Sequence, residues 1–561
     1  MIKKYFSLIL LIAFIGIAQA YAEADKVAIA SAHPLATAAG FEVMTKGGNV
    51  FDAAVAVSAT LAVVEPSGSG LGGGGYWLLH SESDGFETMV DGREKAPLAA
   101  HQAMFLDKAG KLVPRLSLDG PLAAAIPGLP AALVHIAEKY GRLPLAESLQ
   151  PAIRAAEKGF AICEKYRKLL TVRAEVVKKY PSSTQIFLAD GKVPDAYSIL
   201  RQPELAFTLK QLAKSGRDGF YSGELAEKLV EGVKLAGGIW TQQDLSTYQV
   251  VEREPVTGHY RGINITSAAP SSSGGTVLIE ALNILAAYDL RKVDPLTRKH
   301  LIIEAMRRAY HDRALYLGDP DFIEIPIRRL LDENYAAGLR SSLRLDKALP
   351  SDLMSGDNQP QPEGPNTTHF SIIDQQGNRV AATLSINFPF GSGFVVPGTG
   401  IILNDQMDDF ASQPGVMNGY GLVGGFANAI APGKRMLSSM TPTFLDDGKH
   451  IAVLGTPGGS RIISMVLLAV LDFAEGHGPD SWVQLPRYHH QFMPDVVEYE
   501  QGALNTDDLK GLTAMGHQLK EARYLYGDMQ AVEWNKISHQ LTAASDRRGE
   551  GRAVVDFRTV N

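Results

Sequence analysis

Two adjacent threonines, Thr367 and Thr368, stand where a polar stretch of the chain meets a β-patterned one. Residues 351–366 read SDLMSGDNQPQPEGPN, a composition typical of an exposed linker. Residues 369–374 and 379–387, HFSIID and RVAATLSIN, predict a β-hairpin with QQGN as its turn. We interpret the boundary as a cleavage site between Asn366 and Thr367, after which the threonine acts as the catalyst.

Polar side chains gather around this hairpin. Strand alternation places three of them on one face of the second strand: Thr383, Ser385 and Asn387. A further strand, predicted over residues 400–404, leads into DQMDDF, which supplies Gln406, Asp408 and Asp409. Carboxylates and amides at strand ends suit recognition of an ammonium group. Taken singly, each is equally typical of a solvated loop.

Three later segments carry further candidate groups. Residues 412–435 form a long loop with six glycines and Tyr420 near its centre, a length typical of functional loops. The segment LSSMTPT offers adjacent hydroxyls at Ser438 and Ser439. Gly458 and Gly459 precede a helix predicted over 461–471, where backbone N–H groups could bind an oxyanion. A helix start built only for packing has the same pattern.

The elements that must position these groups alternate between helix and strand. A short strand (27–30) and an amphipathic helix precede residues 52–64, which are apolar on every face and predict a fully buried helix. Strands follow at 76–80 and 86–90, and residues 120–350 are mainly helical by periodicity. Serines in APSSSGG (269–275) are expected to cap the next helix or to contact substrate. A layered mixed α/β or α+β architecture is expected.

A literal G-x-G-x-x-G occurs at Gly68, Gly70 and Gly73. A dinucleotide fingerprint needs a strand before it and a helix after it, whereas here the predicted order is reversed. Close backbone packing is therefore the preferred interpretation. Arg93, in DGREKAP, is a surface charge when it is considered alone.

Composition narrows the class of protein. The 561-residue chain has 45% hydrophobic residues and a net charge of -7, so no broad positive field for nucleic acid is expected. Residues 1–22 predict a signal peptide cut after Ala20 or Ala22, with an uncleaved anchor as the alternative. Cys163 is the only cysteine, which excludes an intramolecular disulfide. His489 and His490 would point to opposite faces of a strand, so no metal site is predicted there.

Nine segments in order resemble the bacterial γ-glutamyltranspeptidases (glutathione hydrolases), a family of N-terminal nucleophile hydrolases. They are HPLATAAGFEVMTKGGNVFDAAVA, EPSGSGLGGGGY, DGREKAP, YLGDPDF, NTTHFS, ILNDQMDDF, YGLVGG, LSSMTPT and TPGGSRI. The resemblance spans essentially the whole chain after residue 22. It implies an α+β, four-layer αββα fold, no cofactor or metal, and a precursor cut into subunits 23–366 and 367–561 that remain one unit. It also implies a periplasmic or secreted protein with no stable membrane anchor.

The resemblance assigns roles to the candidate residues. Thr367 would be the nucleophile, activated by its own freed α-amino group and assisted by Thr368 or Ser385. Five groups of residues would complete the site: Arg93, Ser438 and Ser439 for a substrate α-carboxylate; Asn387, Gln406 and Asp409 for the α-ammonium; Gly458 and Gly459 for the oxyanion; Tyr420 as a lid; and Asn366 as the end released by cleavage. The γ-glutamyl group of glutathione or glutamine would pass to water, an amino acid or a dipeptide.

Some features depart from the family pattern. Ser385 stands where many relatives have Thr, and SGSGLGG lacks the His that commonly follows the Pro. Two alternatives remain at this point: a glutaryl-cephalosporin-type acylase, which needs no ammonium subsite, and an uncleaved, inactive binding homologue.

Overall fold

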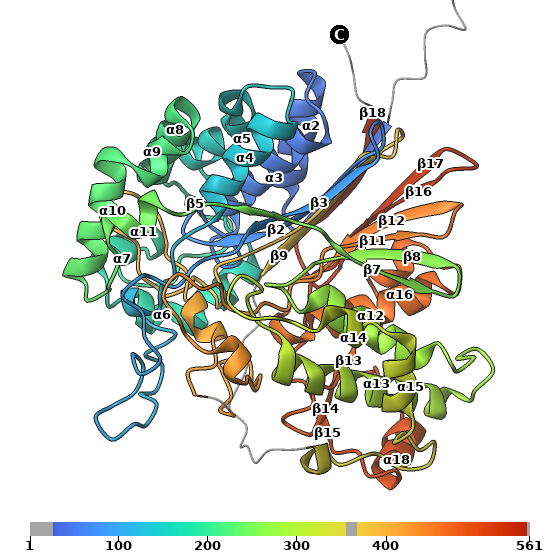
Figure 1. Ribbon diagram of the computed structural model, residues 1–561. Coiled ribbons are helices and arrows are strands. Elements are labelled where there is room, and N and C mark those ends of the chain that lie inside the picture. Colours follow the sequence, from blue (N-terminus) through green and yellow to red (C-terminus); the bar gives the residue numbers. More distant parts are fainter. Residues whose placement is uncertain (1–25, 355–366, 414, 558–561) are drawn as a thin grey trace, which may run out of the picture.

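Two antiparallel sheets lie face to face between two layers of helices (Figure 1). The computed structural model describes residues 26–354, 367–413 and 415–557. The first sheet has the order β18 (Arg552–Phe557), β1 (Lys26–Ser31), β9 (Thr368–Asp374), β10 (Arg379–Ser385), β2 (Gly74–Ser81), β3 (Phe86–Gly92) and β6 (Val251–Arg253). The second has the order β17 (Gln540–Ser545), β16 (Gln530–Asn535), β12 (His450–Gly455), β11 (Thr443–Asp446), β8 (Ile263–Ser267) and β7 (Val256–Tyr260). The predicted four-layer αββα arrangement is confirmed.

Strand β1 shows why four layers form. Its side chains are buried on both faces: Val27 and Ile29 belong to the core beneath the first helical layer, whereas Ala28 and Ala30 belong to the core shared with the second sheet. The sequence of a strand that is covered on both faces is apolar at successive positions rather than at alternate ones.

The outer helices cover the two sheets from opposite sides (Figure 1). The helices over the first sheet include α2 (Pro34–Thr45), α3 (Val50–Val64), α4 (Leu129–Tyr140), α5 (Leu145–Lys158) and α8 (Pro203–Ser215). Those over the second include α12 (Gly274–Leu285), α13 (Pro295–Tyr316) and α16 (Ile462–Phe473). As predicted, α3 is buried along its whole length, and a capping box between Asn49 and Asp52 fixes its start.

The remaining elements are shorter or peripheral. They are η1 (Pro121–Ala123), β4 (Phe160–Ala161), α6 (Glu164–Val177), α7 (Pro181–Phe187), β5 (Ile199–Leu200), α9 (Asp218–Tyr221), α10 (Gly223–Leu235), α11 (Gln242–Ser246), α14 (Ile327–Leu330), α15 (Glu333–Arg340), η2 (Ser351–Met354), η3 (Gln406–Asp409), η4 (Phe426–Asn428), η5 (Gly459–Arg461), α17 (Pro479–Trp482), β13 (Tyr488–His489), β14 (Val497–Tyr499), α18 (Thr506–Ala514) and β15 (Leu519–Glu521). Within the described ranges, no helix combines the length and the apolar composition needed to cross a bilayer.

The predicted hairpin around Thr367 is confirmed. Strands β9 and β10 pair antiparallel, with Thr383 opposite His369 and Leu384 opposite Thr368. The turn between them contains Gly377 at a φ of +95°, a conformation that favours glycine.

The region predicted to be mainly helical is mainly helical, although strands β6, β7 and β8 interrupt it. Two local expectations are wrong. Residues 400–404 form isolated bridges to Gly72 and Val395 rather than a strand, because Gly398 and Gly400 turn the chain at positive φ. The first residues of the predicted linker, 351–354, fold as η2 with Ser351 buried. The rest of that linker (355–366), the predicted signal peptide and its cleavage positions lie outside the described residues.

Candidate active site

Thr367 lies immediately before β9 and is buried between the two sheets. Its Oγ1 atom is 3.4 Å from the Oγ of Ser385, the last residue of β10. The antiparallel register accounts for this contact, because Leu384 faces Thr368 and the next pair along the ladder is Ser385 and Thr367. The hairpin therefore places two hydroxyl groups side by side, as the strand alternation predicts.

A small cavity beside Thr367 contains most of the predicted site. It has a volume of about 20 Å³, room for about one water molecule. Its lining includes these predicted residues: Arg93, Thr367, Ser385, Asn387, Gln406, Asp409, Tyr420, Ser438, Ser439 and Gly459. These residues come from segments more than 300 positions apart, and the fold brings them together.

The amide and carboxylate groups of the predicted ammonium subsite meet at one side of this cavity. Gln406 Nε2 donates to Asp409 Oδ2 at 3.2 Å, and Asn387 is held by a bond from its Nδ2 to the Asp405 carbonyl at 2.9 Å. Asp408, the other carboxylate of the DQMDDF segment, instead accepts from Ser117 Oγ at 2.6 Å and from a loop N–H. The 3₁₀ turn η3 therefore directs only one of its two carboxylates into the site.

Arg93 is almost fully buried, so its interpretation as a surface charge is wrong. Its Nη2 donates to Asp409 Oδ2, its Nε donates to the Met436 carbonyl at 3.3 Å, and its Nη1 lies 3.6 Å from Glu94. Burial disfavours the charged guanidinium, but the carboxylates of Asp409 and Glu94 outweigh it and raise the pKa of Arg93. Arg93 and Asp409 therefore form a buried ion pair on the cavity wall.

Ser438 and Ser439 lie on the other side of the cavity. Ser438 Oγ accepts from the Met440 N–H at 3.0 Å, and Ser439 Oγ accepts from Arg313 Nη2 at 3.2 Å. The serines of APSSSGG support this loop. The capping interpretation is wrong for the N-cap residue Ser273, whose side chain makes no capping bond and whose Oγ donates to the Ser438 carbonyl at 2.7 Å. Ser272 Oγ accepts from the Gly274 N–H at the start of α12 at 3.2 Å.

The two glycines before α16 adopt backbone conformations that favour glycine. Gly458 has a φ of +146° and Gly459 a φ of +58°. A Cβ on Gly459 would lie 2.4 Å from the ring of Tyr420, so this position has no room for a side chain. The turn η5 places Gly459 on the cavity wall, whereas Gly458 is not among the lining residues.

Tyr420 closes the cavity. Its hydroxyl donates to the Asn387 carbonyl at 3.1 Å, and its ring packs on Phe388 with ring centroids 4.8 Å apart. Burial raises the pKa of Tyr420, which keeps the phenol protonated as a donor. The predicted lid residue is therefore in contact with the site.

The glycine-rich run after α3 packs against the strand that carries Ser385. A Cβ on Gly73 would lie 2.2 Å from the Ser385 carbonyl oxygen, and one on Gly68 would lie 3.3 Å from the Thr367 carbonyl oxygen. This supports close backbone packing as the function of these glycines.

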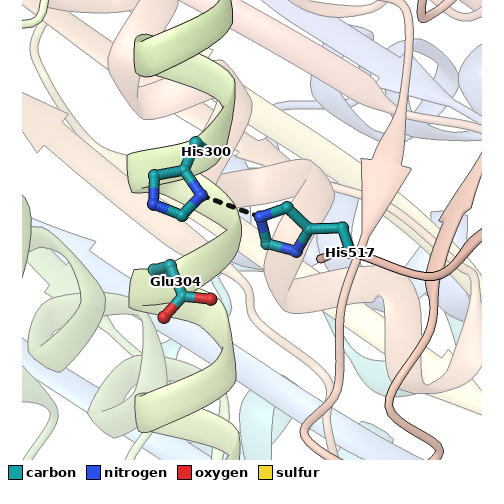
Figure 2. A group of neighbouring side chains, drawn as sticks. All are labelled: His300, Glu304 and His517. Carbon is teal, nitrogen blue, oxygen red and sulfur yellow. Dashed lines mark hydrogen bonds between the residues drawn. The ribbon is translucent and has the colours of Figure 1, made fainter. Parts of the chain in front are cut away.

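Among the described residues, two clusters outside the cavity have residue types that bind metals: Asp472, Glu475 and His477, and the group of His300, Glu304 and His517 (Figure 2). All three residues of the second cluster are buried. His300 Nε2 donates to the Arg344 carbonyl at 2.7 Å, so His300 Nδ1 accepts from His517 Nε2 at 2.8 Å. Both oxygens of Glu304 accept from arginines, Oε1 from Arg307 and Oε2 from Arg308. Two guanidinium groups already occupy the oxygens of the only carboxylate in this cluster, which disfavours a bound metal ion. We interpret the cluster as a buried polar network.

The two histidines considered for a metal site have other partners. His489 contacts Ser464 and lies 2.8 Å from Gln491 Oε1, and His490 lies 3.0 Å from Asp495. Burial lowers the pKa of His489 to about 3, which leaves it neutral.

Sequence reasoning missed two residues of α13. Arg313 lines the cavity, and the hydroxyl of Tyr310 donates to the Ser460 carbonyl beside Gly459. Their spacing of three residues could have identified them from the sequence, since it places both side chains on one face of a helix.

Comparisons with known proteins agree with this arrangement. A sequence model of the family described as Gamma-glutamyltranspeptidase matches residues 36–556. A Glutathione hydrolase proenzyme of Pseudomonas sp. (strain A14) is 43% identical over 506 residues, covering 89% of this chain and 88% of that protein. A protein of the same name from Escherichia coli (strain K12) is 41% identical over 527 residues, covering 93% and 90%.

Solved structures show the same fold. The cephalosporin acylase from Bacillus halodurans matches with a TM-score of 0.84 and 28% identity over 95% of this chain and 96% of that one. The γ-glutamyltranspeptidase of Helicobacter pylori matches with a TM-score of 0.56 and 42% identity over 57% of this chain and 93% of that one. The αββα layers and these neighbours define an N-terminal nucleophile hydrolase.

Within that class, the chain belongs to the γ-glutamyltranspeptidase family, and the protein is an enzyme.

Proposed function

We propose that this protein hydrolyses the γ-glutamyl amide bond of glutathione and related compounds and transfers the γ-glutamyl group to water or to an amine acceptor. The observation that carries this proposal is the cavity itself. Its lining holds a guanidinium, two serine hydroxyls and an amide–carboxylate set, beside one buried threonine hydroxyl. This arrangement is complementary to a head group with both an α-carboxylate and an α-ammonium.

The chemistry starts at Thr367. Its hydroxyl attacks the γ-carbonyl carbon of the substrate while its α-amino group, freed by cleavage, takes the hydroxyl proton. The amine leaving group departs with a proton from that α-ammonium, and the γ-glutamyl group remains as an ester on Oγ1. Water or an amino acid amine then attacks the ester and regenerates the threonine. Backbone N–H groups at Gly458 and Gly459 stabilise the oxyanion in both steps.

Binding the head group requires a change of partners. In the structure Asp409 is paired with Arg93. A substrate ammonium would take over Asp409, with Asn387 and Gln406, and the substrate carboxylate would take over Arg93. Since the head group carries one charge of each sign, its binding leaves the net charge of the cavity unchanged.

Maturation would use the same hydroxyl. Thr367 would attack the Asn366 carbonyl, and water would hydrolyse the resulting ester, giving subunits 23–366 and 367–561. The printed name "proenzyme" of the relatives supports a precursor that is cut. The signal-like sequence of residues 1–22 supports export to the periplasm without a retained anchor.

The alternative activity is that of an acylase, because one structural neighbour is named a cephalosporin acylase. Two p-nitroanilides separate the two activities. The γ-glutamyl anilide carries the α-ammonium, and the glutaryl anilide lacks it. We expect kcat/KM for the γ-glutamyl anilide to be higher by at least about 100-fold, the value of one charge-assisted contact. Equal or faster hydrolysis of the glutaryl anilide would refute the proposed function.

A further inference from the structure

Arg313 supports the carboxylate side of the cavity from behind. It lies in the last turn of α13, is 4% exposed and lines the cavity together with Thr367. Its Nε donates to Ser273 Oγ at 2.9 Å and its Nη2 to Ser439 Oγ at 3.2 Å. Ser273 in turn donates to the Ser438 carbonyl. Arg313 therefore fixes both residues of the serine pair.

Within the described part of the chain, Arg313 has no carboxylate in direct contact: Asp409 acts on it only at longer range and is itself paired with Arg93. Among residues 26–354, 367–413 and 415–557, no carboxylate lies within ion-pair distance of its guanidinium, whereas Arg93 has Asp409 and Glu94 as neighbours. Burial lowers the pKa of Arg313 to about 10, so the group is still charged at neutral pH. A buried cation without a counter-ion is costly, and this cost favours an anion in the cavity.

A substrate carboxylate would supply the missing negative charge. The cavity lining holds two guanidinium groups, Arg93 and Arg313, and one carboxylate, Asp409. Once a substrate ammonium group pairs with Asp409, the cavity lining offers no other carboxylate to the two guanidinium groups. The α-carboxylate is the group of the substrate that can serve them, directly at Arg93 and through the Ser439 hydroxyl at Arg313.

We propose that Arg313 is a positioning residue that makes the enzyme selective for acyl groups bearing an α-carboxylate, by orienting the Ser439 hydroxyl and placing a second positive charge beside Arg93. The proposal deepens the proposed γ-glutamyl activity and rests on it. It also explains why a strongly polar side chain is buried at the end of α13.

The test compares two anilides that differ in the carboxylate. The 4-aminobutanoyl anilide keeps the amine and the acyl chain of the γ-glutamyl anilide but has no α-carboxylate. In Arg313→Gln we expect kcat/KM for the γ-glutamyl anilide to fall about 100-fold, mainly through a higher KM, because a hydrogen-bonded charge is lost. For the 4-aminobutanoyl anilide we expect kcat/KM to change by less than about threefold, the size of effect that a small rearrangement of side-chain packing would cause. An equal fall on both substrates would overturn the proposal, since a purely structural role affects both alike.

Two milder variants keep the proposal testable if Arg313→Gln does not fold. Arg313→Lys keeps the charge but loses the planar fork, and Ser273→Ala removes one of the two anchors of the guanidinium. Both should lower the preference for the γ-glutamyl anilide by a smaller factor in the same direction. Unchanged preference in both would refute the role of Arg313. Failure of the proposed function is recognised separately, because the unaltered enzyme would then not prefer the γ-glutamyl over the glutaryl anilide.

Discussion

The hydroxyl of Thr367 has a hydroxyl neighbour whose own bonding is well defined. Ser385 Oγ lies 3.4 Å away and accepts from the Asn387 N–H at 2.9 Å. An oxygen that already accepts one bond is free to donate its proton, so Ser385 can donate to Thr367 or share its proton. Thr368, the other candidate for this role, starts β9, and its hydroxyl is buried without a partner among the described residues. Ser385 is therefore the better candidate for assisting the nucleophile.

Replacing Ser385 tests this assignment. We expect Ser385→Ala to lower kcat about tenfold, the effect of one neutral hydrogen bond. Ser385→Thr should retain most of the activity, because it keeps the hydroxyl and matches the residue of many relatives. The measurement is steady-state hydrolysis of the γ-glutamyl anilide. An alanine variant as fast as the unaltered enzyme would show that Ser385 does not assist.

At the scale of single residues, the sequence alone does not show which charged side chains are buried. Arg93 and Arg313 are both fully inside the protein, although arginines are mostly exposed. Their burial depends on partners that lie far away in the chain, Asp409 for Arg93 and Ser439 for Arg313. No local pattern contains that information. The hydroxyl pair at Thr367 and Ser385, in contrast, follows from strand alternation within one hairpin and is predictable.

Among the elements, the turn before α16 has a strict steric requirement. Gly459 has a positive φ, and a Cβ there would lie 2.4 Å from Cε1 of Tyr420. A side chain would displace the lid residue and with it the Asn387 contact of the Tyr420 hydroxyl.

We expect Gly459→Ala to lower kcat/KM about 100-fold or more, because the clash of the new Cβ with Tyr420 displaces the backbone N–H from the oxyanion position. Gly476→Ala is the matched control, since Gly476 also has a positive φ (+87°) but would place its Cβ in open space. Kinetics of both variants on the γ-glutamyl anilide separate backbone strain from loss of the site. Similar activity in the two variants would contradict this interpretation of Gly459.

Helix α13 holds the segment that precedes residue 355. His300 donates to the Arg344 carbonyl, Arg308 Nε to the Leu339 carbonyl at 3.0 Å, and His311 contacts the Met354 carbonyl at 3.1 Å. Glu304 lies on the same helix as His300, beside His517 (Figure 2). It accepts from Arg307 and Arg308. One helix face therefore holds Leu339, Arg344 and Met354, which belong to the described residues before position 355.

Glu304→Gln should lower the free energy of unfolding by about 3 kcal/mol, because among the described residues it leaves the buried guanidinium of Arg308 without a carboxylate and that of Arg307 with Asp495 alone. Urea denaturation gives this difference. Glu224→Gln is the control: Glu224 pairs with Lys228 at 2.8 Å on an exposed helix surface, and its loss should produce no measurable change. Equal changes in the free energy of unfolding for the two substitutions would show that the buried Glu304 network stabilises the fold no more than an exposed ion pair does.

The elements differ in how well sequence predicts them. The buried helix α3 and the hairpin β9–β10 follow from clear periodicity over many residues. Strands β6, β7 and β8 have three to five residues each and lie between helices. They are too short for an alternation of apolar and polar residues to be recognised. Residues 400–404 have an apolar strand composition, but the glycines that turn the chain before them prevent a ladder.

At the scale of the whole molecule, the proposed subunits are interleaved. Strand β1, from the N-terminal part of the chain, lies between β18 and β9, both of which follow Thr367. Strand β10 pairs with β2 across the same division. A cut before Thr367 would therefore leave two chains that share one sheet and do not separate without unfolding.

His369 joins the two sheets and makes folding stability depend on pH. Its ring contacts Thr383 Oγ1 at 2.8 Å and Ser371 Oγ at 3.1 Å, and Ser371 donates to Gln530 of the second sheet. Burial lowers the pKa of His369 from 6.5 to about 3. Below pH 6.5 the unfolded chain takes up a proton on this residue, whereas the folded protein does not until the pH approaches 3. The contribution of His369 to stability is therefore complete above pH 6.5 and is lost as the pH falls.

We expect His369→Gln to destabilise the protein at pH 7 and to be less destabilising at pH 5, by about 2 kcal/mol for one imidazole over this interval. Urea denaturation of both proteins at the two pH values gives the comparison. The same destabilisation at pH 7 and pH 5 would contradict a neutral His369 between the sheets.

The central claim is that Thr367 cuts the chain and then catalyses the reaction. Intact-mass spectrometry with N-terminal sequencing of the purified protein tests both parts most directly. The account predicts two chains, the smaller beginning Thr-Thr-His at Thr367, and a single inactive chain for Thr367→Ala. Cleavage of the Thr367→Ala protein, a different new N-terminus, or full activity in an uncut chain would contradict the account.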